Sequence, residues 1–342
     1  MKQKNLYLPS GYLDFEQLVD SEYPFAFCIG GRATGKTFGA LAYAADHFKH
    51  TGETFIYMRR TKSQADLIST DFFNPFKPVN NAYGLNIIPA PVAKGVSGFY
   101  QDGSGPCMGV IAAFSTFSNF RGFDASSVDL VIYDEFQRNS GERSIRDEGF
   151  ALLNVFETVN RNRELTGKPP VKLVCLSNAN SISNDTYIDL ELVGPSEQMR
   201  KLGKNQWYLP ERGIALYDLS DSKISKKKKD TALYRMDQGG RFSEMSLENV
   251  YEDYDETMIK SEPLREFRPL VRIGELCIYQ HKADRRYYVT FHESGSCPRY
   301  TMTEVEKTRF ITKYSYLWEA FLGERIVFES FLIKKLFEQL FL

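Results

Sequence analysis

A run near the amino end of the chain combines glycine, lysine and threonine at a spacing suited to phosphate binding. It lies between the apolar stretch PFAFCIG and a segment with helical spacing, and it reads Gly30-Gly31-Arg32-Ala33-Thr34-Gly35-Lys36-Thr37. Glycines let backbone N–H groups turn toward phosphate oxygens, and the start of the following helix adds positive potential. In this P-loop pattern Lys36 would reach the β- and γ-phosphates, and Thr37 would ligate Mg²⁺. The run therefore predicts a site for ATP with Mg²⁺.

An acidic pair, Asp134-Glu135, ends a second apolar stretch, VDLVIYDEF. One carboxylate at such a place can ligate the magnesium, and the other can orient or deprotonate a water molecule. A pair that merely caps a strand is the alternative, but the complete P-loop upstream favours the catalytic interpretation. Asp134 would suit any P-loop protein, whereas Glu135 favours hydrolysis over transfer to a small acceptor. The pair predicts an ATPase rather than a kinase.

Two further sets of polar residues follow ordered stretches. Ser177 and Asn178 end the stretch VKLVCLSNA, where many P-loop ATPases place a group that senses the γ-phosphate. A turn whose Ser and Asn serve only the turn is the alternative. Arg161 and Arg163 follow a helical segment, whose dipole favours cations at that end in any case. From spacing alone, each set remains open to a role at the nucleotide site or to a purely structural role.

The elements that must position these residues alternate between short β-rich runs and longer helical ones from Phe25 to about Leu219. This alternation predicts an α/β fold with a mainly parallel sheet covered by helices. The strand candidates are PFAFCIG, TFIYMRR, MGVIAAFS, DLVIYDEF and VKLVCLSNA. Several are apolar on successive residues, as strands buried on both faces are. Apolar spacing over 149–165 predicts a helix with one buried face.

The remainder of the chain predicts a linker and a second domain. The segment 221–249 is polar and lysine-rich and contains a Gly-Gly pair. Beyond it, PLVRIGELCIYQHKADRRYYVTFHES predicts two strands around a turn, and ERIVFESFLIKKLFEQLF predicts an amphipathic terminal helix. We therefore expect a P-loop domain over 1–220, a linker over 221–249 and a small α+β domain over 250–342.

Composition limits the class of protein. The chain has 342 residues, 42% of them hydrophobic and 25% charged, which is ordinary for a globular protein. The formal net charge of -1 argues against a globally basic nucleic-acid binder, so any DNA contact must be local. Five scattered cysteines without a CxxC pair argue against a zinc site or a disulfide scaffold. The lack of a long apolar run predicts a cytosolic protein with no membrane contact.

In their order and spacing, several stretches resemble the DNA-packaging ATPases of small tailed phages of the phi29 type. They are GGRATGKT, TFIYMRRTK, VIYDEFQR, ALLNVFETVNRNRE, LVCLSNANS and GRFSEMSLENVY. The resemblance is nearly continuous from about residue 5 to 250 and is weaker beyond. It implies an ASCE-type P-loop ATPase domain, followed by a domain similar to a degenerate RNase H-like fold.

The resemblance also implies a function and roles for single residues. In that family a homopentameric ring at the portal vertex of the prohead, in the host cytoplasm, hydrolyses ATP to push double-stranded DNA inside. Carried over by position, Lys36 and Thr37 hold the nucleotide and Mg²⁺, Asp134 ligates the metal and Glu135 activates water. The arginine finger that acts on a neighbouring subunit falls on Arg161, and a lysine thought to reach that subunit falls on Lys62. An isolated monomer should then hydrolyse slowly. Phi29 docks its motor on a structural RNA, and the sequence leaves open whether this chain needs one.

DNA contact is expected from loops that line a pore. The loop FQRNSGERSIRDEG offers Arg138, Arg143 and Arg146 with acidic residues between them, and a merely solvated loop is the alternative. The stretch STFSNFRGFDASS resembles the Arg-Gly stretch that precedes the acidic strand in large terminase subunits. Contacts with phosphates would be independent of DNA sequence and sensitive to salt.

Three other classes of function compete with the packaging ATPase. The first is a large terminase with an active nuclease, which needs several carboxylates around a metal pair. The candidate C-terminal strands carry only Glu275, Asp284 and Glu293, so we expect this domain to bind nucleic acid or the portal rather than to cut. The second is a P-loop kinase, and the third is a nucleotide-gated assembly protein in which hydrolysis is incidental.

Overall fold

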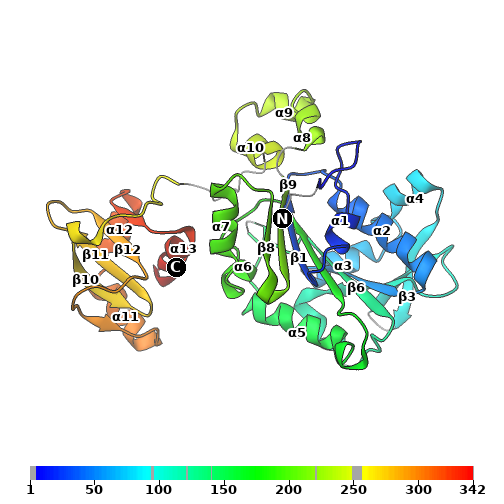
Figure 1. The fold of residues 1–342 in the computed structure, drawn as a ribbon, viewed down its shortest axis with the longest axis horizontal. Helices are drawn as coiled ribbons and strands as arrows, with labels where there is room; N and C mark the ends of the chain where they lie inside the picture. The colour runs from blue at the N-terminus through cyan, green and yellow to red at the C-terminus, as the bar shows by residue number, and fades with distance from the viewer. Residues whose placement is uncertain are drawn as a thin grey trace. The chain divides into compact units, whose positions relative to one another are not determined.

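A computed structural model describes residues 5–93, 96–120, 122–139, 141–219, 222–248 and 256–341. The chain divides into two compact units, Met1–Glu252 and Asp253–Leu342 (Figure 1). The described part of the segment expected to be a linker forms short helices that are grouped with the first unit. As a division of function, the expected domain boundaries stay a prediction.

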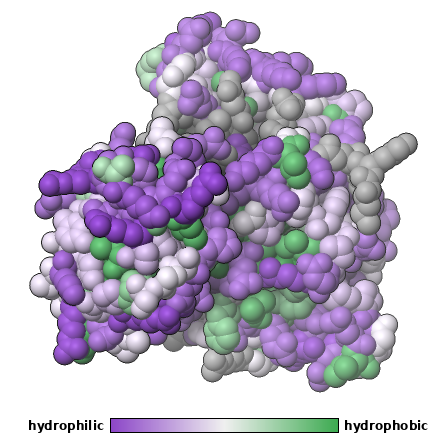
Figure 2. Space-filling view, turned by 60° about the vertical axis from the view of Figure 1, so that its left-hand side comes forward, coloured by the Kyte–Doolittle hydropathy of each residue, from purple (hydrophilic) through white to green (hydrophobic). Residues whose placement is uncertain are grey.

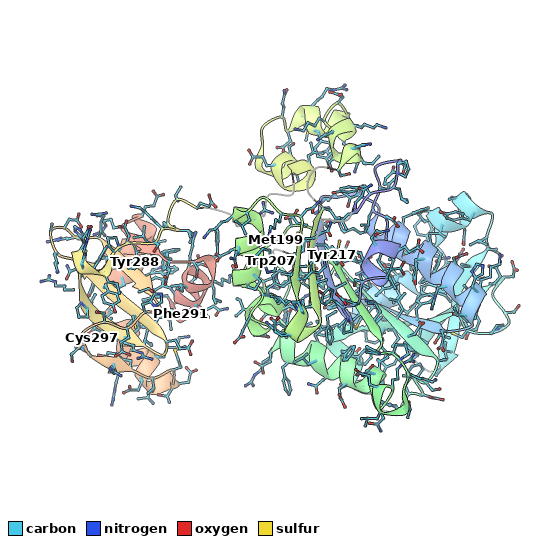
Figure 3. All side chains as sticks on the ribbon, viewed as in Figure 1. Met199, Trp207, Tyr217, Tyr288, Phe291 and Cys297 are labelled. Atoms are coloured by element: carbon cyan, nitrogen blue, oxygen red, sulfur yellow. The ribbon has the colours of Figure 1, made fainter. Side chains whose placement is uncertain are left out.

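The first unit is built on a nine-stranded sheet in the order β3-β4-β5-β2-β6-β7-β1-β9-β8. Six neighbouring strands are parallel: β5 (Gly109–Ala113), β2 (Thr54–Arg59), β6 (Val128–Asp134), β7 (Lys172–Ser177), β1 (Phe25–Gly30) and β9 (Ile214–Leu219). The others pair antiparallel at the two edges: β3 (Ile87–Ala93), β4 (Val96–Gln101) and β8 (Gln206–Leu209). Trp207 and Tyr217 mark the β8 and β9 edge in Figure 3. The prediction of a mainly parallel sheet is confirmed, and the five strand candidates form β1, β2, β5, β6 and β7.

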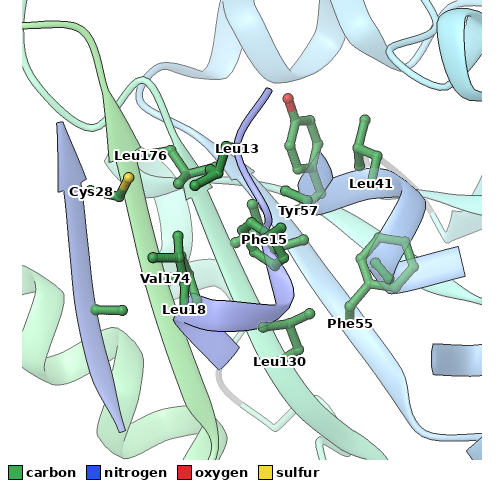
Figure 4. Close-up of a cluster of buried hydrophobic side chains, with 14 of the residues drawn as sticks. Leu13, Phe15, Leu18, Cys28, Leu41, Phe55, Tyr57, Leu130, Val174 and Leu176 are labelled. Carbon is green, nitrogen blue, oxygen red and sulfur yellow. The ribbon is translucent and has the colours of Figure 1, made fainter. Parts of the chain in front are cut away.

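Helices pack on this sheet because their apolar residues recur on one face. The long helix α2 (Lys36–Thr51) buries Ala40, Leu41, Ala44 and Ala45, and the small alanines allow its axis to approach the strands. Leu41 belongs to the same buried cluster as Phe55 and Tyr57 of β2 (Figure 4). The helix ends at Gly52, whose φ of 76° is the left-handed conformation that glycine adopts without strain.

The remaining helices of this unit are shorter. They are α1 (Glu16–Val19), α3 (Lys62–Ile68), α4 (Lys77–Tyr83), α5 (Glu148–Asn160), α6 (Asp185–Asp189), α7 (Val193–Lys201), α8 (Lys223–Lys228), α9 (Ala232–Met236) and α10 (Arg241–Glu248). The prediction of one helix over 149–165 was wrong about its end. Arg161 has φ 42° and ψ -124°, which stops α5 at Asn160, and a separate 3₁₀ turn follows at Glu164–Thr166.

The strand order decides which residues meet. Strand β7 lies between β1 and β6, and β2 lies on the other side of β6. Parallel strands end at the same edge of a sheet. The carboxyl edge therefore gathers the P-loop, the end of β7, the acidic pair and the two arginines at the end of β2, Arg59 and Arg60.

The second unit is a small mixed sheet with helices, in the strand order β13-β10-β11-β12-β14. Its elements are β10 (Phe267–Ile273), β11 (Leu276–His281), β12 (Tyr287–Thr290), β13 (Arg299–Tyr300), α11 (Glu304–Lys313), α12 (Tyr316–Leu322), β14 (Ile326–Phe328) and α13 (Phe331–Phe341). The predicted pair of strands is in fact three, β10 to β12. The predicted terminal helix begins only at Phe331, because Ile326–Phe328 pairs with β12. The prediction of a small α+β domain is confirmed, and its likeness to an RNase H fold stays a prediction.

Hydrophilic residues cover much of the face shown in Figure 2, and hydrophobic ones form small separate patches. Within the described residues, no helix is both long enough and apolar enough to cross a membrane.

Candidate active site

The P-loop closes around the ammonium group of Lys36. The turn between β1 and α2 uses left-handed backbone at Ala33 (φ 58°) and Gly35 (φ 92°). Lys36 is buried, and its Nζ donates hydrogen bonds of 2.8 Å to the carbonyl oxygens of Gly30 and Gly31. Burial lowers the pKa of Lys36 to about 8. A buried cation that has only neutral acceptors is suited to exchange them for phosphate oxygens.

The end of β7 completes the surroundings of this lysine. Asn178 accepts a 3.2 Å hydrogen bond from Lys36 Nζ through its side-chain oxygen, whereas Ser177 is buried as the last residue of the strand. The structure thus brings Asn178 and the P-loop lysine together. A sensing role for Ser177 and Asn178 stays a prediction.

The buried carboxylate of Asp134 lies beside Thr37. Its Oδ2 accepts hydrogen bonds from Thr37 Oγ1 (2.8 Å), Tyr57 OH (2.7 Å) and an Arg59 N–H (3.3 Å). A hydroxyl and a carboxylate are hard oxygen ligands, which Mg²⁺ prefers, and the metal commonly adds waters and substrate phosphates to one or two such groups. Thr37 and Asp134 therefore fit the metal that a P-loop implies. Tyr57 was not expected from sequence, and it orients the carboxylate from the neighbouring strand.

Glu135 has strained backbone and a guanidinium partner. Its φ is 55°, a conformation that is uncommon for a residue other than glycine. The side chain is 41% exposed, and its Oε2 forms an ion pair with Arg59. Burial would lower the pKa of Arg59, but Tyr57, Asp134 and Glu135 raise it, with a net shift above the ordinary value. Arg59 therefore stays cationic and restrains the carboxylate expected to activate water.

The adjacent arginine, Arg60, organises the loop that follows the acidic pair. Its side chain is fully buried and forms an ion pair with the buried carboxylate of Glu148. It also donates to the carbonyl oxygens of Phe136 and Arg143, both at 3.4 Å, and lies 3.5 Å from a carboxylate oxygen of Glu142. The end of β2 is thereby fixed to both ends of the loop. The double arginine of TFIYMRR was the only sequence signal for Arg59 and Arg60.

The three arginines expected to contact DNA lie on this loop in different surroundings. Arg138 is partly buried, 3.8 Å from Asp185. The Arg143 side chain is exposed, and Arg146 is 93% exposed beside Asp147 at 3.3 Å. The Arg121-Gly122 stretch has its arginine outside the described residues. DNA binding by these residues stays a prediction.

Arg161 lies at the opposite edge of the sheet. Its guanidinium donates to the carbonyl oxygens of Thr158 (3.1 Å) and Phe123, and the side chain is exposed. Two residues on, Arg163 donates to Val128 O at the start of β6 (2.8 Å). Since β6 runs from Val128 to Asp134, the two edges are separated by about 20 Å at the usual rise per strand residue. Arg161 is therefore remote from the P-loop of its own chain.

Lys62 lies near the carboxyl edge, but it does not join the cluster of site residues. It is the first residue of α3, after the N-cap Thr61, whose hydroxyl accepts a hydrogen bond from Gln64 N. Its half-exposed ammonium pairs with Asp66 on the same helix at 2.7 Å. A contact with a neighbouring subunit stays a prediction.

Fold and site together define a P-loop protein of the class that places one strand between the P-loop strand and an acidic strand. Residues 7–266 match the model of one family, described as the podovirus DNA encapsidation protein (Gp16). The chain belongs to this family. It is 29% identical over 253 residues to the DNA packaging protein of Bacillus phage phi29, an alignment that covers 73% of this chain and 67% of that protein.

Two solved structures share the fold. A chain of the bacteriophage phi29 viral genome packaging motor assembly matches with a TM-score of 0.68 at 22% identity, covering 98% of this chain and 99% of that one. A chain of the phi28 gp11 DNA packaging motor matches with a TM-score of 0.60 at 18% identity, covering 93% and 94%. The fold similarity thus extends over both units, beyond the region matched by the family model.

Proposed function

We propose that this protein is the ATPase of a phage DNA-packaging motor, which couples ATP hydrolysis to translocation of double-stranded DNA into a prohead. The observation that carries the proposal is the meeting of Lys36, Thr37, Asp134 and Glu135 at one edge of the sheet. Membership in the DNA encapsidation family indicates that hydrolysis is coupled to DNA packaging.

The geometry suggests how this site would work. Lys36 exchanges its carbonyl partners for phosphate oxygens, while Thr37 and Asp134 hold the Mg²⁺. When bound, the metal neutralises charge that develops on the phosphates. Arg59 pairs with one oxygen of Glu135, and release of this pair would free the whole carboxylate to take a proton from the attacking water. The ion pair is therefore suited to restrain hydrolysis until the site is assembled.

The position of Arg161 favours an active site shared between copies. A guanidinium at the far edge of the sheet, about 20 Å away along the strands, cannot stabilise the transition state at its own P-loop, but in a ring it is free to act on the P-loop of an adjacent copy. Phe150 and Leu153 are exposed on α5, which ends just before this arginine. Exposed apolar side chains of this kind are typical of protein contacts. A homopentamer is the ring size found in the phi29 type, and we propose it here by family.

The loop after Glu135 is suited to gripping DNA. Arg143 and Arg146 extend into solvent, while Arg60 fixes the base of the loop beside the catalytic glutamate. Contacts between these arginines and phosphates do not depend on base sequence, so the motor could translocate any DNA. The portal vertex of the prohead in the host cytoplasm is the proposed place of action, and a structural RNA is a further candidate partner there.

The ion pairs of the second unit favour a domain that binds nucleic acid or the portal over one that cleaves DNA. Glu293 pairs with Arg272 and Arg299, and Asp284 pairs with Arg286 at 2.9 Å. Among the residues that the structure describes, no group of three or more His, Cys, Asp or Glu side chains could hold a metal ion. A two-metal nuclease requires such a convergence of carboxylates.

The test is steady-state ATP hydrolysis by the purified protein as a function of protein concentration, with and without duplex DNA. We expect the rate per subunit to rise with concentration and to rise again with DNA. Glu135→Gln should lower the rate about 10²- to 10⁴-fold while leaving ATP binding unchanged. A rate indifferent to concentration, to DNA and to portal-bearing proheads would overturn the packaging proposal. Phosphoryl transfer to a small acceptor without DNA would instead indicate a kinase.

A further inference from the structure

Two helices of the segment 222–248, α8 and α10, contact the P-loop, and the start of the segment contacts the chain near Gly11. At its start, Ser222 Oγ donates to the carbonyl oxygen of Gly11 (3.1 Å). At its far end, the backbone of α10 approaches Gly31 so closely that a Cβ on that glycine would lie 2.4 Å from Ser246 O. Gly31 is therefore needed for this contact as well as for the phosphate turn. Figure 1 shows α8, α9 and α10 gathered as one group of short helices.

The same segment brings a second lysine to the loop. Lys228, at the end of α8, donates a 3.0 Å hydrogen bond from Nζ to the carbonyl oxygen of Arg32. The guanidinium of Arg32 lies 5.6 Å from the ring centroid of Phe242 in α10. Three successive P-loop carbonyls, those of residues 30, 31 and 32, thus accept hydrogen bonds from two ammonium groups, those of Lys36 and Lys228.

We propose that Lys228 is an additional nucleotide-binding residue, whose ammonium contacts a phosphate of the bound nucleoside triphosphate. The inference rests on the proposed function, because it assumes that the P-loop binds such a ligand. Lys228 shares one feature with Lys36, since its ammonium donates to a neutral carbonyl oxygen of the P-loop, but it is less buried. An anionic phosphate oxygen is a stronger acceptor for an ammonium group than a carbonyl. Burial also lowers the pKa of Lys228, which an adjacent anion would reverse.

Phosphate contact by Lys228 would tie the segment 222–248 to the occupancy of the nucleotide site. The ligand would be held from the β1 to α2 turn on one side and from α8 on the other. Binding should then protect the segment from proteolysis, in addition to filling the site. The segment contains lysines at 223 and at 226 to 229, so the rate of trypsin cleavage there measures how well the segment is protected.

The experiment is a calorimetric titration of the full chain with a non-hydrolysable ATP analogue and Mg²⁺. Lys228→Ala should weaken binding about 10- to 100-fold, the usual range for a hydrogen bond to a charged group. The matched control is Lys227→Ala on the same helix, where the side chain is exposed, and it should bind within about twofold of the unaltered protein. Lys228→Arg keeps the charge and should retain most of the affinity. Weak binding in both variants would instead indicate that substitution at this position disturbs folding.

The outcomes separate this inference from the proposed function. Loss of binding in Lys36→Ala together with unaltered binding in Lys228→Ala would overturn the role of Lys228 and leave the ATPase proposal intact. No binding by the unaltered protein would contradict both. A second readout is trypsin cleavage within 222–248: the analogue should slow it in the unaltered protein and in Lys227→Ala, but not in Lys228→Ala. Equal protection in all three proteins would also overturn the inference.

Discussion

The two edges of the large sheet differ in how their charged side chains are satisfied. At the carboxyl edge, Lys36, Asp134 and Glu135 all have partners within the chain, and Arg59 and Asn178 supply several of them. At the amino edge, the exposed guanidinium of Arg161 donates to backbone carbonyls alone among the described contacts. The first edge gathers the groups of the proposed nucleotide site, whereas the second presents a cation remote from that site in its own chain.

Strained backbone marks both edges. Glu135 (φ 55°) and Arg161 (φ 42°) are among the few non-glycine residues with positive φ in the described chain. Such conformations cost about 1–3 kcal/mol each and persist where the surroundings impose them, often at functional sites. Both residues are thus held in costly backbone conformations. The edges differ in the partners of the two side chains, since Glu135 pairs with a guanidinium and Arg161 with backbone carbonyls.

The largest effect is expected at the amino edge. Arg161→Ala should lower the DNA-stimulated rate by about 10³- to 10⁵-fold, as removal of an arginine finger does elsewhere. Its P-loop would remain intact, so the variant should bind ATP normally. Lys168→Ala, an exposed neighbour, is the control and should keep the rate within about twofold.

A mixing experiment decides whether Arg161 acts on another copy. Lys36→Ala subunits keep their arginine and should restore hydrolysis to Arg161→Ala subunits, because each supplies what the other lacks. The measurement is ATP turnover across a series of mixing ratios. Absence of rescue at every ratio would contradict action of Arg161 on a neighbouring copy and remove the contrast between the edges.

The next effect concerns the buried ion pair between Arg60 and Glu148, which holds the loop after Glu135. Arg60→Met leaves Glu148 as an unpaired buried carboxylate and should lower the free energy of unfolding by about 3–5 kcal/mol. Adding Glu148→Leu removes the isolated charge and should recover much of that loss. Urea denaturation measures both variants. Additive losses in the double variant would show that the two side chains do not depend on each other.

A smaller effect is expected from Arg59, the next residue toward the amino end. Arg59→Gln removes the ion pair with Glu135 and a charged donor to Asp134, and should reduce the ratio of DNA-stimulated to basal hydrolysis about 10- to 100-fold. Arg59→Lys keeps the charge and serves as the matched variant. An unchanged ratio in Arg59→Gln would mean that the pair does not restrain the glutamate.

The sequence predicted the residues of the carboxyl edge far better than the contacts that surround them. Strands β1, β2, β5, β6 and β7 could be recognised because burial on both faces makes them continuously apolar. Strand β3 was not predicted because it contains Pro89 and Pro91, which argue against a strand except at the edge of a sheet. Arg59 and Arg60 are neighbours in sequence with different partners, because successive strand residues point to opposite faces and only the fold says what lies there. The same limit applies to Lys228, which a linker-like composition concealed.

The smallest predicted effect tests whether the carboxyl edge also carries the DNA contact. Arg146 is 93% exposed and pairs only loosely with Asp147, so its removal should not disturb the fold. Arg146→Ala should weaken duplex binding a few-fold and reduce the slope of log affinity against log salt by about 1, the value for one phosphate contact. Fluorescence anisotropy at several salt concentrations measures the slope, and Arg146→Lys should keep it, because a point charge is sufficient for a phosphate. An unchanged slope in Arg146→Ala would show that Arg146 makes no phosphate contact, and the same result for Arg143→Ala would leave the carboxyl edge as a nucleotide site alone.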